Sequence, residues 1–157
     1  MATSSEHKIL LGEAGEQLVL SRLLRLGFIA SQAPRTWRSD DIYLSNGISL
    51  QVKTTVKKRN WMVGKVEVQE HRFYALVDYS DPFVPTVFVM PSKDIFAASE
   101  ALHIAVQSKA KTPNFGLAIR NIQDPWIPTD APPEYLPGWL EERYLEAWHL
   151  LGAGKVR

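Results

Sequence analysis

The chain has 157 residues, of which 45% are hydrophobic, and it carries a net charge of +1. This length and apolar content are enough for one domain built around one core. Cysteine is absent, which excludes disulfides, thiolate metal sites and a cysteine nucleophile. No apolar run reaches the ~18 residues that a membrane-spanning helix needs, and residues 1–8 lack the basic-then-apolar order of a signal peptide. We therefore expect a soluble, cytoplasmic protein.

Charge is distributed unevenly along the chain. Residues 1–72 contain 11 Lys and Arg against 7 Asp and Glu, whereas residues 73–157 contain 7 against 10. The small net charge therefore conceals a basic first part. Such an imbalance points to a polyanionic partner.

The first predicted element is a helix over about residues 6–26, ending at Gly27, which suits the left-handed position after a helix. On a helical wheel, Glu16 lies at the centre of the apolar stripe, which contains Ile9, Val19, Leu20 and Leu23. A lone buried carboxylate is costly, so Glu16 requires a cationic partner. Two partners fit this position: an arginine in a structural ion pair, or a metal ion.

Residues 40–53 predict a β-hairpin, because apolar and polar residues alternate on both arms and Asn46-Gly47 marks the turn. A two-residue loop would mix polar and apolar side chains on each face. A three-residue loop over 45–47, with Gly47 in a left-handed bulge, removes this conflict. It pairs Leu44 with Ile48, Ile42 with Leu50, and Asp41 with Gln51. One face of the hairpin is then apolar.

The other face of the hairpin is polar and carries Asp41, Tyr43, Ser49, Gln51 and Lys53. Directly opposed residues have Cβ atoms ~5 Å apart, which is close enough to share one ion. Oxygen ligands of this kind suit Mg²⁺, which keeps several waters and commonly binds phosphate. In this register the side chain of Asp40 points to the apolar face.

These residues predict a site for phosphate chemistry. Asp41, the amide oxygen of Gln51 and the carbonyl of Val52 would hold the ion, and Glu16 would complete its shell. The ion would polarise a phosphate and lower the pKa of a bound water. Lys53 would steady the charge that develops on phosphorus, or orient the attacking water.

Two basic segments flank the hairpin. Before it, a short strand over about 28–32 and the following loop bring Arg35 and Arg38 close. After it, the run Lys57-Lys58-Arg59-Asn60-Trp61 has the composition of a segment that holds a backbone phosphate and an unstacked base. Surface charge is the alternative interpretation of these basic residues.

Further strands are predicted from apolar runs. Residues 66–69 suggest a short strand, and residues 73–79 and 86–90 predict central strands buried on both faces. Residues 117–120 would close the sheet as an edge strand.

Two more helices are predicted. Pro91-Ser92 supplies a stop and a cap for a helix over 93–109, with Ile95, Phe96, Ala98, Leu102 and Val106 at helical spacing. Residues 124–137 are dense in proline and predict an extended tether. A final helix over 138–151 either docks on the core or forms a homodimer contact, through a stripe of Leu140, Tyr144, Ala147, Trp148 and Leu151.

Three short motifs resemble a known family. Gly15-Glu16 on the first helix, Asp41-Ile42 on one strand and Gln51-Val52-Lys53 on the next look like the PD-(D/E)XK nuclease superfamily, which includes many restriction endonucleases and archaeal Holliday-junction resolvases. The resemblance covers roughly residues 8–120. It implies a restriction endonuclease-like α/β core with a mixed central sheet flanked by helices (αβββαβ) in residues 1–122. Residues 123–157 have no counterpart in the family, and we expect this proline-rich tether and C-terminal helix to pack on the same domain.

The resemblance also implies roles in a metal-dependent endonuclease that hydrolyses DNA with Mg²⁺, for which Mn²⁺ can substitute. Asp41 would be the principal metal ligand, Lys53 the catalytic lysine and Glu16 the helix carboxylate. Gln51 replaces the second acidic residue, which removes one negative charge and should weaken metal binding, although some active members also use Gln here. Asp40 stands where the family pattern has Pro.

Two other interpretations remain open. One is a catalytically weak or inactive module that keeps the nuclease fold and binds nucleic acid or a partner protein. The other treats the acids as a structural ion-pair network in a protein of unrelated purpose. DNA cleavage that depends on Asp41 and Lys53 would distinguish the nuclease from both.

Overall fold

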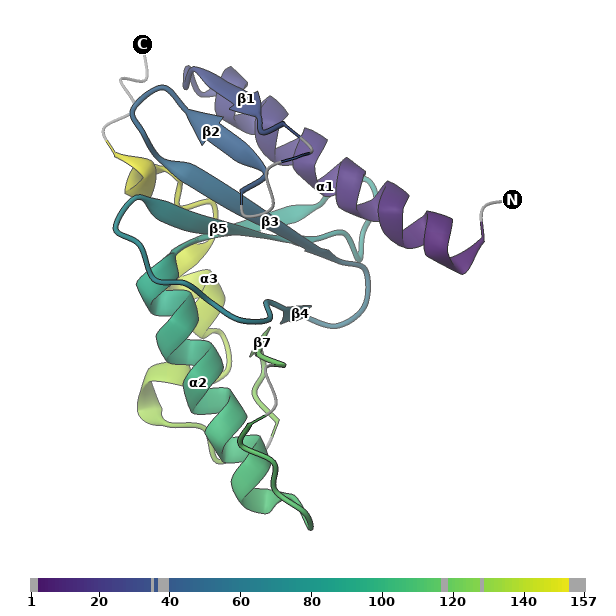
Figure 1. The fold of residues 1–157 in the computed structure, drawn as a ribbon, viewed down its shortest axis with the longest axis vertical. Coiled ribbons are helices and arrows are strands. Elements are labelled where there is room, and N and C mark those ends of the chain that lie inside the picture. Colours follow the sequence, from purple (N-terminus) through teal and green to yellow (C-terminus); the bar gives the residue numbers. More distant parts are fainter. Residues whose placement is uncertain (1–2, 35, 37–39, 117–118, 128, 153–157) are drawn as a thin grey trace.

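The computed structural model describes residues 3–34, 36, 40–116, 119–127 and 129–152 (Figure 1). In chain order the helices and strands are α1 (Ser4–Arg25), β1 (Ala30–Gln32), β2 (Ile42–Leu44), β3 (Ser49–Thr55), β4 (Asn60–Met62), β5 (Arg72–Asp78), β6 (Thr86–Pro91), α2 (Ser92–Lys109), β7 (Asn121–Gln123) and α3 (Trp139–Tyr144). Short 3₁₀ helices cover Pro133–Tyr135 and Trp148–Leu151. None of the helices in the described residues has the length and apolarity that crossing a bilayer requires.

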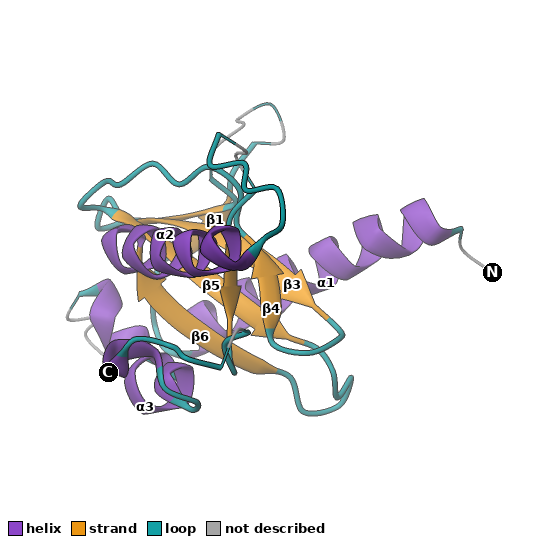
Figure 2. Ribbon diagram, turned by 90° about the horizontal axis from the view of Figure 1, so that it is seen from below, coloured by secondary structure: helices purple, strands orange, loops and turns teal. Residues whose placement is uncertain are grey.

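The centre of the fold is a five-stranded sheet in the order β1-β2-β3-β5-β6. β3 and β5 run parallel and the other neighbours run antiparallel, so the sheet is mixed, as predicted. Val19 and Leu23 of α1 belong to the apolar cluster on one face, and Ile95 and Leu102 of α2 to the cluster on the other. Figure 2 shows the two helices on either side of the strands. The predicted α/β class, with helices flanking a mixed sheet, is therefore confirmed.

The hairpin formed by β2 and β3 has the predicted register. Ile42 pairs with Leu50 and Tyr43 with Ser49, and the amide of Leu44 donates to the carbonyl of Ile48 over 2.9 Å. Gly47 has a φ of +89°, the left-handed conformation that a three-residue loop of this kind requires. The apolar face of the hairpin is consequently buried, and Ile42 and Leu50 have no exposed surface.

The ends of α1 follow from local sequence. Thr3 and Glu6 form a capping box, in which each side chain accepts a hydrogen bond from the other residue's amide. The helix ends at Arg25, and Gly27 has a φ of +91°, as its position predicts. The Phe28–Gln32 strand is also present, shortened to Ala30–Gln32.

The buried side of α1 differs from the prediction. It consists of Gly15, Val19 and Leu23 rather than a stripe centred on Glu16, which is only half-buried. Ile9, predicted on the stripe, is 71% exposed. The reason is that the N-terminal part of α1 extends beyond the sheet, so no strand covers it (Figure 2).

Gly15 lets α1 approach β3 closely, which gives a prediction. A Cβ atom at Gly15 would lie 1.9 Å from Oγ1 of Thr54, whereas a Cβ atom at Gly12 would meet nothing within 4 Å. We expect Gly15→Ala to lower the free energy of unfolding by about 1–3 kcal/mol through overpacking. The matched Gly12→Ala should raise it by up to ~1 kcal/mol, because alanine favours helix. Urea unfolding measures both, and equal stability of the two variants would contradict this packing.

Two predicted strands are corrected. The strand expected at 117–120 falls later, at Asn121–Gln123. It pairs with β4 in a separate two-stranded ribbon and does not close the main sheet. Residues 117 and 118 lie outside the described residues. Residues 66–69 form no strand, because this segment is tied to α2 by the Ser92 hydroxyl, which bonds the amide and the carbonyl of Gln69. Ser92 therefore does not cap α2, although that helix lies where it was predicted.

The long strands were predicted closely, but one lies elsewhere in the sheet. β5 is central and buried on both faces. β6 is equally buried although it lies at the edge of the sheet. Its outer side is covered by the C-terminal segment, where Leu145 forms a bridge to Phe88 and the amide of Glu146 donates to the carbonyl of Val87. Of the apolar positions predicted to face inward from α2, Phe96 and Val106 are exposed.

The proline-rich segment is packed rather than free. Trp126 is buried and stacks on Tyr135 with ring centroids 4.8 Å apart. The carboxylate of Asp124 accepts from the amide of Gly138 at 3.0 Å, which fixes the start of α3. These contacts correct the prediction of a tether and join the described part of this segment to the α2 side of the core.

The predicted final helix is interrupted. α3 ends at Tyr144, the bridge at Leu145 follows, and Glu146 has a φ of +47° before the last 3₁₀ helix. All five residues of the predicted stripe are nevertheless buried. Leu140 and Tyr144 pack on the α2 side of the sheet, whereas Ala147, Trp148 and Leu151 pack on the α1 side. The segment therefore wraps around β6, which a continuous helix could not do.

Candidate active site

Asp41 lies where β2 separates from β3. Its amide donates to the carbonyl of Leu50 at 2.9 Å, and its carboxylate Oδ2 accepts from the amide of Val52 at 2.7 Å. The pairing of β2 with β3 ends at Ile42 and Leu50, so in the described residues no strand pairs with residues 51–55 on this side. The carboxylate is thereby fixed against the open edge of β3.

Glu16 reaches this carboxylate from α1. A hydrogen bond from its side chain acts on Asp41, so two carboxyl groups from separate elements meet at the edge of β3. Glu16 is half-buried, at the border of the buried side of α1, and not at its centre. Two carboxyl groups in contact need a shared proton or a cation between them. Glu16 is therefore not a lone buried acid, and the pair of carboxyl groups suits either a shared proton or a bound cation.

The local environment favours the neutral form of Asp41. Burial raises the pKa of the Asp41 carboxyl, and the nearby Asp40 carboxylate adds to this effect. The amide of Val52, the charge of Lys53 and the hydrogen bond from Glu16 oppose it but do not cancel it. The folded chain thus carries a carboxylate at a cost that a bound cation would offset.

This cost predicts a pH-dependent effect of Asp41→Asn on stability. A raised pKa means that the folded state holds the proton to a higher pH than the unfolded chain does, so stability is lost as the pH rises through the raised value. In EDTA, Asp41→Asn should therefore unfold at higher urea concentration than the unsubstituted chain at neutral pH. The difference should shrink as the pH falls through that pKa. A difference that is independent of pH would contradict the burial of this carboxyl.

Gln51 and Lys53 approach the same edge from β3. Leu50 and Val52 point into the cluster beneath α1, so the alternation along the strand directs Gln51 and Lys53 to the opposite face. Both are half-buried, and the charge of Lys53 acts on Asp41. Asp41, Glu16 and Lys53 thus act on one another at one edge of β3, and Gln51 lies two residues before Lys53 on the same face of the strand.

Comparison with known proteins adds one finding. Neither a protein-family model nor a curated protein matches this chain. A solved structure does match, that of the bacterial homing endonuclease I-Ssp6803I, with 17% sequence identity, a TM-score of 0.53, and coverage of 99% of this chain and 96% of that chain. The chain shares the fold of a bacterial homing endonuclease. At this identity the match concerns the fold, and it extends over the C-terminal segment as well as the sheet.

In this endonuclease-like fold, Asp40 has a different role from Asp41. Its carboxylate is buried and pairs with Arg72, with 3.0 Å between Oδ1 and Nε, and it accepts from the hydroxyl of Tyr43 at 2.9 Å. Arg72 and Tyr43 lie on the polar side of the hairpin, so the prediction that Asp40 points to the apolar face is wrong. Sequence reasoning missed Arg72, whose signal was a charged residue at the start of a fully apolar strand.

The Asp40–Arg72 ion pair should contribute strongly to stability. Both side chains are only 6% exposed, so Arg72→Met would leave a buried carboxylate without its partner and should lower the free energy of unfolding by about 3–5 kcal/mol. Lys93→Met, at an exposed position, is the control. Urea unfolding monitored by tryptophan fluorescence provides the measurement. A loss no larger than that of Lys93→Met would show that the pair is unimportant.

The basic segment after the hairpin divides into core and surface residues. Trp61 is 1% exposed and its indole donates to the carbonyl of Val77 at 2.9 Å, so it cannot stack on a base, and that prediction is corrected. Arg59 is also corrected: its charge is paired with Asp78 and Glu141, and its guanidinium lies over the ring of Phe88. The physical reason is the β4–β7 ribbon, which turns Trp61 inward.

The remaining predicted nucleic-acid contacts are not altered. Lys57 and Lys58 are exposed in the loop between β3 and β4. Arg35 and Arg38 lie outside the described residues. Sequence reasoning missed Lys8, which lines a groove next to Lys53. Its signal was the spacing of Lys8, Gly12, Gly15 and Val19, which places them on one side of a helix.

Proposed function

We propose that the chain is a metal-dependent endonuclease that hydrolyses phosphodiester bonds in DNA and belongs to the PD-(D/E)XK superfamily. The observation that carries this proposal is the meeting of the Asp41 and Glu16 carboxyl groups beside Lys53 at the edge of β3. A fold alone does not specify a reaction, but the match to a homing endonuclease over nearly the full length of both chains supports the same conclusion.

The donor set fits a hard divalent cation. In the described residues, no three His, Cys, Asp or Glu side chains come together, so the ion would depend on Asp41, Glu16, the amide oxygen of Gln51 and the carbonyl oxygen of Val52. Oxygen-only ligands of this kind suit Mg²⁺, for which Mn²⁺ can substitute. When bound, the ion would polarise a phosphate oxygen and lower the pKa of a coordinated water.

The residues of the chain have separate parts in this proposal. The amide of Val52 fixes the Asp41 carboxylate, which would hold the ion. Lys53 donates to the phosphate as negative charge develops, or orients the attacking water. Arg72 pairs with Asp40, which weakens the effect of that second negative charge beside the site.

Gln51 favours a second candidate function. Its neutral amide removes one negative charge from the ligand set, which lowers the expected affinity for the cation. The second candidate is a catalytically weak or inactive module with the nuclease fold that binds nucleic acid or a partner protein.

Incubation with supercoiled, branched and single-stranded DNA, each with Mg²⁺, Mn²⁺ or EDTA, tests the proposal. The endonuclease will cut at least one substrate with Mg²⁺ or Mn²⁺ and none with EDTA. Cleavage that persists in EDTA would contradict metal dependence. Binding of DNA without cleavage under every condition would favour the second candidate.

A further inference from the structure

A groove of about 380 Å³ begins at Lys53 and runs between α1 and β4. Lys8, Leu11 and Gly12 of α1 form one wall, and Asn60 and Met62 of β4 form the other. The floor is the end of β3, at Lys53 and Thr54. In Figure 1, β3 continues past the end of β2, and α1 and β4 lie on either side of it.

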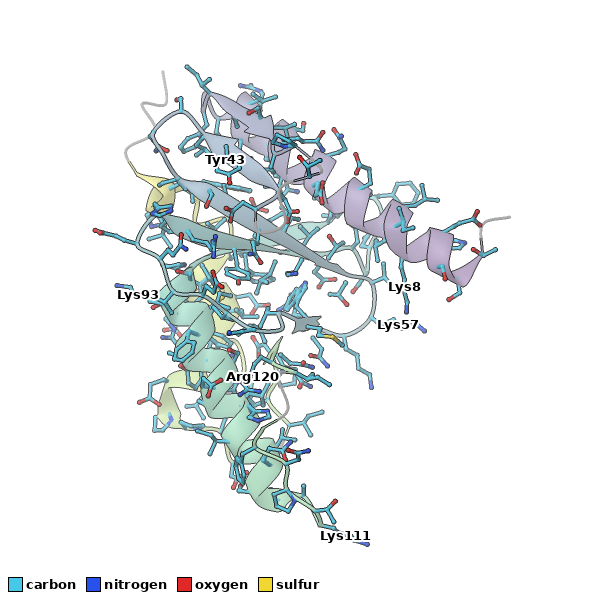
Figure 3. All side chains as sticks on the ribbon, in the orientation of Figure 1. Lys8, Tyr43, Lys57, Lys93, Lys111 and Arg120 are labelled. Carbon is cyan, nitrogen blue, oxygen red and sulfur yellow. The ribbon has the colours of Figure 1, made fainter. Side chains whose placement is uncertain are left out.

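The groove has the chemistry of a site for an anionic chain. Two of its lining residues are lysines, and none of those described is acidic. Lys57, in the loop between β3 and β4, is exposed, and Figure 3 shows its side chain and that of Lys8 at the same end of the molecule. Met62 is 66% exposed, so its side chain is available at the wall of the groove. Ammonium groups beside an exposed apolar side chain match a backbone phosphate next to a sugar or base.

We infer that this groove holds the DNA strand adjacent to the phosphodiester that is cut, with Lys8 contacting a backbone phosphate and Met62 contacting the sugar or base. The inference rests on the proposed function, because the groove is continuous with the candidate active site through Lys53. That continuity also favours a nucleic acid over an acidic peptide, since a strand whose phosphate lies at Lys53 must leave along an open path.

Binding to a labelled duplex in EDTA, at several salt concentrations, tests the groove separately from cleavage. Each phosphate contact contributes ~0.9 to the slope of log affinity against log salt. A fourfold rise in salt weakens the binding of DNA by every protein. For Lys8→Gln this weakening should be roughly threefold smaller than for the unsubstituted chain. Lys8→Arg should retain the slope, and Met62→Glu should weaken binding, because it places a negative charge in the groove.

Lys93→Gln and Lys111→Gln are the matched controls, because both lysines are exposed on the part of the molecule formed by α2 and the segment after it (Figure 3). A salt slope for Lys8→Gln equal to that of the controls would overturn the inference, even if Asp41 and Lys53 prove essential for cleavage. The inference would also be overturned if Lys8→Gln weakened the binding of polyglutamate as much as it weakens the binding of DNA. A reduced slope in a protein that cuts no substrate would show that the groove binds DNA and would favour the second candidate function over the nuclease.

Discussion

Asp41→Asn will lower the rate of DNA cleavage by about a thousandfold or more. The substitution keeps the shape of the side chain and can still accept from the amide of Val52, but it removes the charge that would hold the cation. Metal ions provide several kcal/mol of stabilisation to developing charge, and ~4 kcal/mol corresponds to a thousandfold change in rate. The measurement is the single-turnover rate of nicking of supercoiled DNA at saturating protein.

Glu142→Gln is a suitable control for this experiment, because it neutralises an exposed acid on α3. Asp41→Asn should also fold normally, and its stability at neutral pH in EDTA should exceed that of the unsubstituted chain. A variant that is folded, binds DNA and still cuts within tenfold of the normal rate would remove Asp41 from the mechanism.

Lys53→Met will lower the same rate by about a hundredfold to a thousandfold, the typical effect of removing one group that stabilises transition-state charge. Methionine keeps an unbranched, flexible stem but lacks the ammonium group. Under the proposed function Lys53 would donate to the phosphate and would not ligate the metal, so affinity for Mn²⁺ should change little. This combination separates Lys53 from Asp41, whose substitution should reduce both quantities.

Lys57→Met provides the comparison for Lys53→Met. Lys57 is exposed four residues further along the chain, so its loss should weaken DNA binding while leaving the single-turnover rate at saturation nearly unchanged. Equal effects of the two substitutions on that rate would show that Lys53 acts only by attracting DNA.

Local patterns were sufficient to predict the part of the fold that positions the site. The hairpin register followed from alternation and one glycine, and it correctly paired Ile42 with Leu50, which places Asp41 directly before β2. The end of α1 shortly before Gly27 followed from the conformational freedom of glycine. β5 was recognisable because a strand buried on both faces is continuously apolar.

Contacts between distant segments account for most of the differences. Trp61 resembles an exposed aromatic in a basic loop until β7, about 60 residues later, pairs with β4 and turns it inward. Arg72 and Asp40 are 32 residues apart and meet only because β5 lies beside β3. The break in the final helix at Leu145 exists because the edge of β6 offers backbone groups for pairing.

Glu16 was predicted as a site residue from a helical wheel that was partly wrong. The wheel placed it at the centre of the buried stripe by counting Ile9, which is exposed because α1 extends past the sheet. The buried side is rotated toward Gly15, and Glu16 lies at its border, where it contacts Asp41. Periodicity indicates which side of a helix is apolar, but only the extent of the neighbouring sheet determines how much of that side is covered.

Binding of Mn²⁺ to the protein–DNA complex, followed by electron paramagnetic resonance, tests most directly whether these groups form a cation site. The unsubstituted chain and Lys53→Met will bind the ion, and Asp41→Asn and Glu16→Gln will each bind it much more weakly. Equal binding by all four proteins would contradict a metal site at Asp41 and Glu16.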